Sequence, residues 1–320
     1  MFFIGLIIGG GITLFAVGFQ FAPSISIPNQ TELSTEASQN LPRLIALEST
    51  DIPQQPTRTR VPPTSAIQPN LTTVGTIVSA TPTPLSLLHE QRPDVIGYSV
   101  EGRPLNVYTF GDGAHQRMIV AGIHGGDEWN TTTLANQLIE YLDQYPDVVP
   151  DDVTLYILPS LNPDGEARAH NKYGRLNRNG VDLNRNFPIN WRADWNRGGC
   201  WNYLPSSGGT APGSEAETQA LMNFINNHKI EALISYHSAA LGIFPGGDPW
   251  DENSIRLAES IAQVSEYPFP PLDTGCTYSG TLPDYAVLQG IAAVDLELTN
   301  HIETDFGMNL DILEVLLSWE

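Results

Sequence analysis

Positively charged residues are scarce in this sequence. Its 320 residues include 15 Lys and Arg against 36 Asp and Glu, which gives a formal net charge of -21 at pH 7. Proteins that bind nucleic acid neutralise phosphates with a basic surface. The charge balance therefore excludes nucleic acid as an expected partner.

The few cations are also unevenly distributed. Seven of the fifteen lie between Arg168 and Arg197. A basic cluster in an acidic protein indicates a site for an anionic group. The alternative is a solvated loop whose cations balance nearby acids.

Cysteine is scarce as well, and the sequence holds only Cys200 and Cys276. A cysteine ligand to a metal is disfavoured, because better candidate ligands are present. If the domain is exported, a single Cys200–Cys276 disulfide is expected. Two unpaired thiols remain the alternative.

Charge is missing altogether from the N-terminal segment. Residues 1–22 are almost entirely apolar, and the first charged side chain is Glu32. The length suits a membrane span. It also suits a secretory signal, but a basic n-region is missing and residues 16–18 make a poor cleavage site. We expect a retained membrane anchor, with a cleaved signal as the alternative.

Sustained hydrophobic periodicity is missing from residues 23–88. This stretch holds ten prolines and many Ser, Thr and Gln, a composition typical of a linker that does not fold. We expect it to hold a folded domain, residues 89–320, away from a membrane. That arrangement predicts an extracytoplasmic domain, anchored or secreted.

From residue 89 onward, strand and helix patterns alternate. Residues 95–100 and 105–110 form a hairpin pattern, and four apolar runs predict buried strands at 118–123, 153–158, 232–236 and 291–298. Helical patterns occur at 129–145, 255–264, 284–289 and 310–319. The alternation predicts a single α/β domain with a mixed, mostly parallel sheet and helices on both faces.

A capping box is predicted at Ser214 and Glu217. The serine can cap the amide three residues on, and the glutamate can reach back. A helix should run from there to about His228. The preceding stretch, residues 162–209, is rich in Gly and Asn and is predicted to form long, functional loops.

Four short motifs carry the candidate chemistry, and they are His124-Gly-Gly-Asp-Glu128, Asn184-Arg185, Ser-Tyr-His237-Ser and Leu-Glu297-Leu. They supply two imidazoles, two carboxylates and a guanidinium. A catalytic zinc takes three protein ligands and leaves a position for water, and a separate carboxylate must take that water's proton. The inventory therefore predicts a mononuclear zinc peptidase.

The positions of these motifs agree with that prediction. His124, His237 and Glu297 lie at or near the ends of predicted strands. In open α/β sheets, ligands bind beyond the carboxyl ends of the strands. The predicted fold and the candidate chemistry therefore converge on one edge of the sheet.

The set of motifs resembles the zinc carboxypeptidase family, which includes pancreatic carboxypeptidases and bacterial murein peptide amidases. The resemblance covers roughly residues 96–319, and the motifs occur in the family's order. Matching segments besides the four motifs are Ile-Gly-Tyr-Ser-Val-Glu-Gly-Arg103-Pro, Leu-Asn-Pro-Asp-Gly165, Gly-Val-Asp182 and Ser214-Glu-Ala-Glu-Thr. The family's fold is the expected carboxypeptidase-like α/β domain.

The resemblance implies one zinc ion per chain, held by His124, Glu128 and His237. The family usually has His-x-x-Glu, whereas here Asp127 stands at that spacing and the glutamate is one residue further on. We expect Glu128 to be the ligand, because the Trp that follows it matches the family's Glu-Trp pair. The two glycines of the motif can absorb the extra residue. Asp127 stays the alternative carboxylate, and His301 the alternative histidine.

The resemblance also assigns the catalytic groups. Glu297 is the expected general base and later acid, in a strand where an unpaired carboxylate is costly. Asp295, on the same face of that strand, is the competing candidate. Arg175 is expected to stabilise the oxyanion, with Arg178 as its alternative. Asp182 is expected to orient the first histidine.

The remaining expected roles concern substrate binding. Asn184 and Arg185 would grip the terminal carboxylate, because a guanidinium offers a planar fork and the amide adds a donor. Tyr278 would close over the substrate. A residue near Leu282 would line the specificity pocket.

The implied activity is hydrolysis of a peptide or amide bond next to a C-terminal residue with a free carboxylate. The substrate would be an ordinary peptide or a cell-wall peptide. Two alternatives remain: a catalytically inactive, zinc-retaining peptide-binding module, and a small-molecule deacylase on the same scaffold. Glu297 argues against the first, and the Asn184-Arg185 pair argues against the second.

Overall fold

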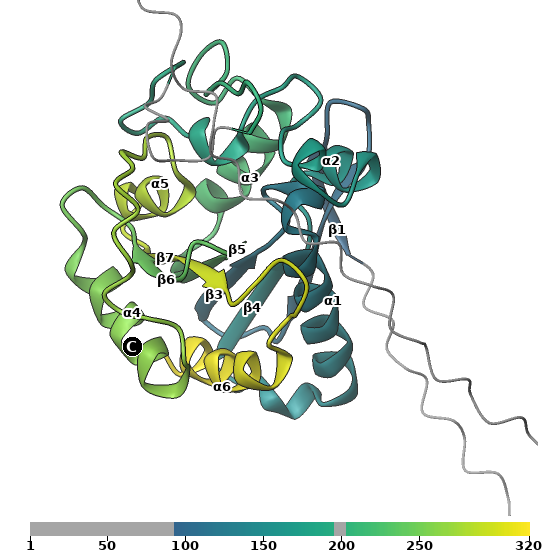
Figure 1. The fold of residues 1–320 in the computed structure, drawn as a ribbon. Helices are drawn as coiled ribbons and strands as arrows, with labels where there is room; N and C mark the ends of the chain where they lie inside the picture. Colours follow the sequence, from purple (N-terminus) through teal and green to yellow (C-terminus); the bar gives the residue numbers. More distant parts are fainter. Residues whose placement is uncertain (1–92, 195–202) are drawn as a thin grey trace, which may run out of the picture. The chain divides into compact units, whose positions relative to one another are not determined.

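The computed structural model describes residues 93–194 and 203–320. Seven strands in these residues form one sheet in the order β1-β2-β4-β3-β5-β7-β6 (Figure 1). Their bounds are β1 Asp94–Tyr98, β2 Pro104–Phe110, β3 His115–Val120, β4 Val153–Leu158, β5 Ile230–Ser238, β6 Gly242–Pro245 and β7 Ala292–Leu298. The predicted mixed sheet is confirmed.

The centre of the sheet is parallel and its margins are antiparallel. Strands β4, β3, β5 and β7 run parallel to one another. The β1–β2, β2–β4 and β6–β7 pairs are antiparallel. The sequence does not predict strand β6, because four residues are too few to show an alternation of apolar and polar side chains.

Helices cover both faces of the sheet (Figure 1). On one face lie α1 (Trp129–Gln144), α4 (Glu252–Val264) and α6 (Phe306–Leu317). On the other face lie α3 (Ala216–Asn227) and α5 (Leu282–Leu288), with the short α2 (Pro163–Arg168) on the same side. Each face has its own buried hydrophobic cluster, as expected for a three-layer α/β domain.

The periodicity of α1 explains its position. Leu134, Leu138 and Leu142 follow one another at intervals of four residues and are fully buried against the sheet. Burying each leucine contributes about 1.5–3 kcal/mol relative to exposure. Strand β4 is buried at every position, as expected for a central strand covered on both faces.

Two strands differ from their predicted bounds near the motifs. Strand β3 ends at Val120, before the predicted end at residue 123, because the chain turns at Gly122 with a positive φ of 59°. Strand β5 extends to Ser238 and therefore includes His237. The first histidine follows its strand by a turn, and the second lies within its strand.

The predicted capping box is wrong. Helix α3 begins at Ala216, and Ser214 Oγ donates to the Glu215 side chain (2.6 Å) rather than accepting from a helix amide. Glu217 accepts from Val100 N (3.1 Å) and from Asn177 Nδ2 (3.3 Å). Partners distant in the sequence thus replace the local capping interaction.

The predicted anchor, residues 1–22, and the predicted linker, residues 23–88, lie outside the described residues, as does Cys200. Their roles and the disulfide therefore stay predictions. Within the described ranges, no helix combines the length and the apolar character needed to cross a membrane.

Replacing Glu217 with Ala should destabilise the domain. The side chain is fully buried, and its loss leaves the Val100 amide without its acceptor and removes one of the two acceptors of Asn177 Nδ2. The expected cost is about 1–3 kcal/mol, measured by denaturant unfolding. Glu314→Ala on the exposed face of α6 is the control and should change stability by less than about 0.5 kcal/mol. Equal effects of the two variants would contradict the assigned contacts.

Candidate metal centre and active site

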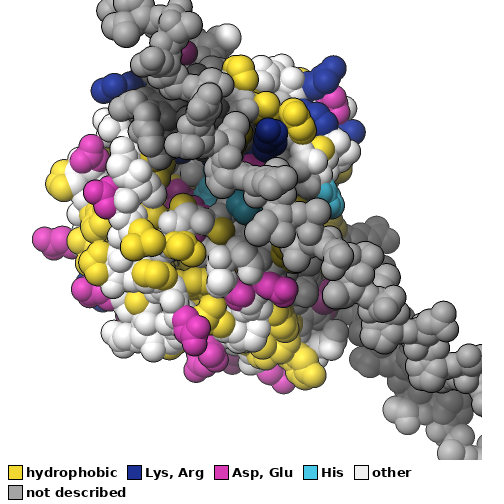
Figure 2. All heavy atoms as spheres, viewed as in Figure 1, with side chains coloured by type: hydrophobic (Ala, Val, Ile, Leu, Met, Phe, Trp, Pro, Cys, Tyr) yellow, Lys and Arg dark blue, Asp and Glu magenta, His cyan; other side chains and the backbone are white. Residues whose placement is uncertain are grey.

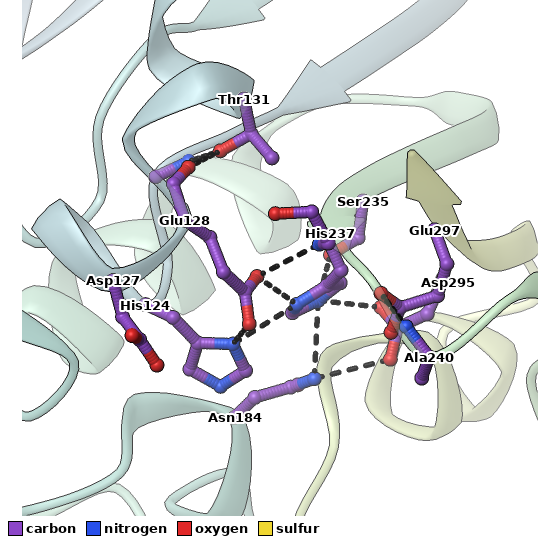
Figure 3. A network of polar contacts seen from close by, with 12 residues as sticks. His124, Asp127, Glu128, Thr131, Asn184, Ser235, His237, Ala240, Asp295 and Glu297 are labelled. Atoms are coloured by element: carbon purple, nitrogen blue, oxygen red, sulfur yellow. Dashed lines mark hydrogen bonds and ion pairs between the residues drawn. The ribbon is translucent and has the colours of Figure 1, made fainter. Parts of the chain in front are cut away.

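Three buried side chains converge at the carboxyl end of the sheet. His124, Glu128 and His237 place one ligand atom each within 4.8 Å of the others, and we call these residues the metal group. Glu128 Oε1 lies 2.7 Å from His124 Nδ1, and Oε2 lies 3.0 Å from His237 Nδ1. The two Nδ1 atoms are 3.1 Å apart (Figure 3).

The sheet brings these residues together. Strands β3 and β5 are parallel neighbours, with Val120 opposite Ser235. The chain leaves β3, turns at Gly122 and reaches His124, while His237 lies two residues beyond Ser235 on the adjacent strand. Glu128 ends the 3-10 turn Gly125–Glu128 that leads into α1.

Two glycines accommodate the extra residue in the first motif. Gly125 has a positive φ of 46°, which favours glycine. A Cβ at Gly126 would lie 1.9 Å from Ala169 O, so only glycine lets the turn pack against the end of α2. This turn directs Glu128 into the metal group. Asp127 points away from it, with Oδ2 3.8 Å from Arg175 Nη1 (Figure 3).

Each imidazole has a carboxylate at its outer nitrogen. His124 Nε2 lies 3.1 Å from Asp182 Oδ1, and His237 Nε2 lies 3.1 Å from Asp295 Oδ1. A carboxylate at Nε2 keeps the proton there and leaves Nδ1 as a free lone pair. Both Nδ1 atoms therefore face the shared centre as potential ligands.

The donor set fits a zinc ion. Two imidazole nitrogens and one carboxylate oxygen are the ligands of the His₂Glu type. Bond lengths of about 2.0–2.1 Å in a tetrahedral site imply ligand atoms roughly 3.3 Å apart. The 2.7–3.1 Å separations in the metal group are close to this value.

The electrostatics of the metal group favour an ionised Glu128. Burial alone would raise its pKa, but the neighbouring His124 and His237 outweigh burial and hold the pKa well below 4.5. Burial likewise opposes ionisation of Asp182, and Arg175 and His124 hold its pKa well below 3.8. A site that keeps its carboxylates ionised while buried suits a cation.

Glu297 stands beside the metal group. In the parallel β5–β7 pair it lies opposite His237, and its Oε2 accepts from Ala240 N (2.9 Å). Burial raises the pKa of Glu297 to about 7, although His237 offsets part of the effect. A carboxyl group with a pKa near neutrality is suited to both accepting and donating a proton.

Arg175 and its alternative, Arg178, lie in different surroundings. Arg175 is buried and donates to Asp182 Oδ2 and to Glu128 Oε1 (3.0 Å). Arg178 is exposed and pairs with Glu101 (3.1 Å). Of the two, Arg175 lines the cavity that contains the metal group.

The two candidate carboxylate-binding residues, Asn184 and Arg185, lie in one 3-10 turn, Leu183–Arg185. Asp182 caps it by accepting from Asn184 N (3.1 Å), and Asn184 Oδ1 accepts from Leu282 N (2.8 Å). The guanidinium of Arg185 lies 5.0 Å from the ring of Tyr278, a distance suited to a cation–π contact.

A cavity of about 1650 Å³ joins these groups. It is lined by the metal group, Arg175, Asn184, Arg185, Tyr278 and Glu297. Figure 2 shows histidine side chains at the surface in the middle of this face, with Lys and Arg gathered in the upper half of the view. The predicted site residues, with Asp182 behind His124, thus surround one space.

Other predicted candidates lie close by. His301 lines the cavity and contacts Ser238 Oγ (3.1 Å), but it is not part of the metal group. The side chain of Leu282 is fully buried in the core, and its neighbours Thr281 and Pro283 line the cavity instead.

Comparison with known proteins identifies the family. The zinc carboxypeptidase family model matches residues 85–303. The chain belongs to the zinc carboxypeptidase family. The donor set of the metal group fits the zinc after which this family is named.

Curated relatives share about a third of their residues with this chain. The human carboxypeptidase N catalytic chain is 31% identical over 200 residues, which cover 55% of this chain and 43% of the relative. Mouse carboxypeptidase A2 is 31% identical over 199 residues, which cover 53% of this chain and 47% of the relative. The chain thus spans about half the length of these relatives.

Solved structures show the same fold. Murein-tripeptide amidase MpaA from Escherichia coli O157 has a TM-score of 0.52 and 26% identity, covering 72% of this chain and 92% of the amidase. Carboxypeptidase A from Helicoverpa armigera has a TM-score of 0.56 and 22% identity, and the match covers 70% of this chain and 67% of that carboxypeptidase. The second likeness shows the fold alone.

Asp295 lies on the same face of β7 as Glu297 but has different contacts. Their shared face makes Asp295 the competing candidate for the general base in the sequence. Asp295 Oδ1 lies 3.1 Å from the outer nitrogen of His237, whereas Glu297 Oε2 accepts from Ala240 N. The pairing with β5 could have been suspected from the predicted parallel strands.

Replacing Glu297 with Gln should lower kcat by about 10²–10⁴-fold while zinc stays bound. The wild-type kcat/KM should fall as pH drops, because Glu297 must be ionised to accept a proton. The midpoint should lie at or below about 7, since a bound cation favours the carboxylate. Glu266→Gln on an exposed loop is the control. Wild-type rates in the Glu297 variant would contradict the assignment.

Proposed function

We propose that this domain is a zinc-dependent metallocarboxypeptidase that hydrolyses a peptide or amide bond next to a C-terminal residue with a free carboxylate. One observation supports the proposal above the others. A carboxylate with a raised pKa, Glu297, and the Asn184–Arg185 pair line the same cavity as the metal group.

His124, Glu128 and His237 would hold the zinc, which supplies Lewis acidity toward the scissile carbonyl and water. The protein's contribution is to fix the imidazoles. Asp182 holds the proton of His124 on Nε2, so that Nδ1 stays available.

Glu297 moves the proton in this proposal. Its carboxylate takes a proton from the attacking water and returns it to the leaving nitrogen. The Ala240 amide fixes one of its oxygens, so the side chain keeps one orientation through both transfers. A pKa of about 7 makes neither transfer strongly uphill near neutral pH.

Three side chains position the substrate. Arg185 binds the terminal carboxylate through its guanidinium fork, and Asn184 adds an amide donor. Tyr278 stacks near Arg185 and covers that end of the cavity. Arg175, buried beside Glu128, faces the negative charge that develops on the carbonyl oxygen.

Asn184 and Arg185 form what we call the substrate clamp. The wall of the cavity near this clamp is acidic. Asp248, Asp284 and Asp295 line it together with apolar residues such as Ile255 and Pro283. Burial raises the pKa of Asp284, and the nearby charges of Asp295 and Asp248 raise it further. Such a wall should disfavour an acidic side chain on the departing residue and favour a cationic one.

A cell-wall peptide is the second candidate substrate. The likeness to a murein-tripeptide amidase extends over 92% of that enzyme at 26% identity. The anchor and linker predicted for residues 1–88 would suit an enzyme that faces the wall from outside the cytoplasm.

The test is a substrate panel assayed with the zinc-loaded full chain. Peptides with a free C-terminal carboxylate should release one residue in a chelator-sensitive reaction, and their amidated counterparts should not. A C-terminal Lys or Arg should be preferred over Asp or Glu by tenfold or more, on the order of one 1.4 kcal/mol interaction. Arg185→Met should remove the discrimination against amidated peptides, and the exposed Arg256→Met should not.

The remaining outcomes separate the alternatives. Cleavage of a murein tripeptide alone would assign the enzyme to cell-wall peptides. Tight zinc binding without either activity would contradict a peptidase and favour the binding module or the deacylase.

A further inference from the structure

Asp295 lies between two functional groups that the sequence separates widely. It is in β7, two residues before Glu297. Its Oδ1 lies 3.1 Å from His237 Nε2 in the metal group. Its Oδ2 accepts from the Asn184 side-chain amide at 3.0 Å. One carboxylate thus contacts a candidate zinc ligand and a candidate carboxylate-binding residue at the same time (Figure 3).

We propose that Asp295 is a positioning residue, which fixes the ring of His237 and the amide of Asn184 and so couples the metal group to the substrate clamp. The proposal rests on the proposed carboxypeptidase function for the role of the clamp. The effect on His237 does not depend on that function.

The neighbours of His237 Nε2 show why the carboxylate is needed. Besides Asp295, the nearest polar atoms are Ser235 Oγ (3.1 Å) and Asn184 Nδ2 (3.3 Å). An amide nitrogen can only donate, and a hydroxyl can donate or accept. Of Asp295, Ser235 and Asn184, only the Asp295 carboxylate can do nothing but accept a hydrogen bond. We therefore expect Asp295 to determine that Nε2 carries the proton. Nδ1 is then left as a lone pair toward Glu128 and His124.

The arrangement repeats on the other side of the metal group. Asp182 contacts His124 Nε2 and accepts from the backbone N–H of Asn184. Asp295 contacts His237 Nε2 and accepts from the side chain of the same asparagine. Asn184 is therefore held at two points, each by a carboxylate that also orients one imidazole.

The same contacts explain how the Asp295 carboxylate can be largely buried. Burial opposes ionisation of a carboxylate, but Asp295 lies 3.1 Å from the His237 ring and accepts a hydrogen bond from the Asn184 side chain. A buried carboxylate with several donors is acceptable, whereas an unpaired one is costly. Oδ2 is hydrogen-bonded to Asn184 and Oδ1 faces the outer nitrogen of His237, so proton transfer is left to Glu297.

The direct test uses the zinc-loaded chain. Zinc on Nδ1 places the His237 proton on Nε2 in every variant, so the readout is the contact that this proton makes. Its ¹H NMR signal should lie far downfield and exchange slowly with water in the wild type, and it should move upfield in Asp295→Asn. An unchanged signal in the variant would overturn the proposal whether or not the protein cleaves peptides.

Variants test the coupling. Asp295→Asn keeps the shape but turns one acceptor into a donor. It should weaken zinc binding by about 10–100-fold, measured by chelator competition, and should raise KM for free-carboxylate peptides. Asp295→Glu should restore part of both properties. Asp284→Asn is the control for zinc binding, because Asp284 accepts from Gly247 N and contacts neither His237 nor Asn184.

A double-mutant cycle with Asn184→Ala measures the link between the two sites. Residues that share a hydrogen bond give non-additive effects, so the loss in the double variant should be smaller than the product of the single losses. Wild-type zinc affinity and KM in Asp295→Asn would overturn the proposal. So would a change confined to side-chain preference, because that result would make Asp295 a specificity residue only.

Discussion

The burial of charge at the carboxyl end of β3 and β5 is the constraint on which the site depends. Two imidazoles and a carboxylate converge there, away from water. Buried ionised groups are stable only when they are paired or bind a cation. Each imidazole therefore has its own carboxylate behind it, and Glu128 lies between the two rings. The chain supplies the outer partners, and the donor set suits zinc at the centre.

The same constraint extends to the substrate-binding side of the cavity. Asp182 contacts His124, Arg175 and the amide of Asn184, so it joins three functional residues. Glycine at position 126 lets the Glu128 turn pack against Ala169 O. Asn162 holds the Arg175 carbonyl at 2.9 Å. The turns that carry Glu128 and Arg175 are thereby fixed against the metal group.

Much of this site could be predicted from the sequence because its chemistry depends on residue types at strand ends. His124, Glu128, His237 and Glu297 lie in short motifs, and the predicted strands bring those motifs to one edge. The α/β class and the mixed sheet followed from apolar runs and helical periods.

Other features could not be predicted, for physical reasons. Glu217 has the spacing of a capping box, but Val100 and Asn177, distant in sequence, bind its carboxylate instead. Strand β6 has too few residues to show a period and forms because β7 offers it an edge. The position of Asp295 behind His237 depends on the register between β5 and β7. Such features arise from tertiary contacts that local patterns do not contain.

A zinc titration of three proteins tests the central claim most directly, by comparing the wild type with Glu128→Gln and Asp127→Asn. The account predicts one tightly bound zinc per wild-type chain, a large loss of affinity in Glu128→Gln and near wild-type affinity in Asp127→Asn. Tight binding in Glu128→Gln with loss in Asp127→Asn would contradict it, because the carboxylate that completes the metal group would then be the wrong one.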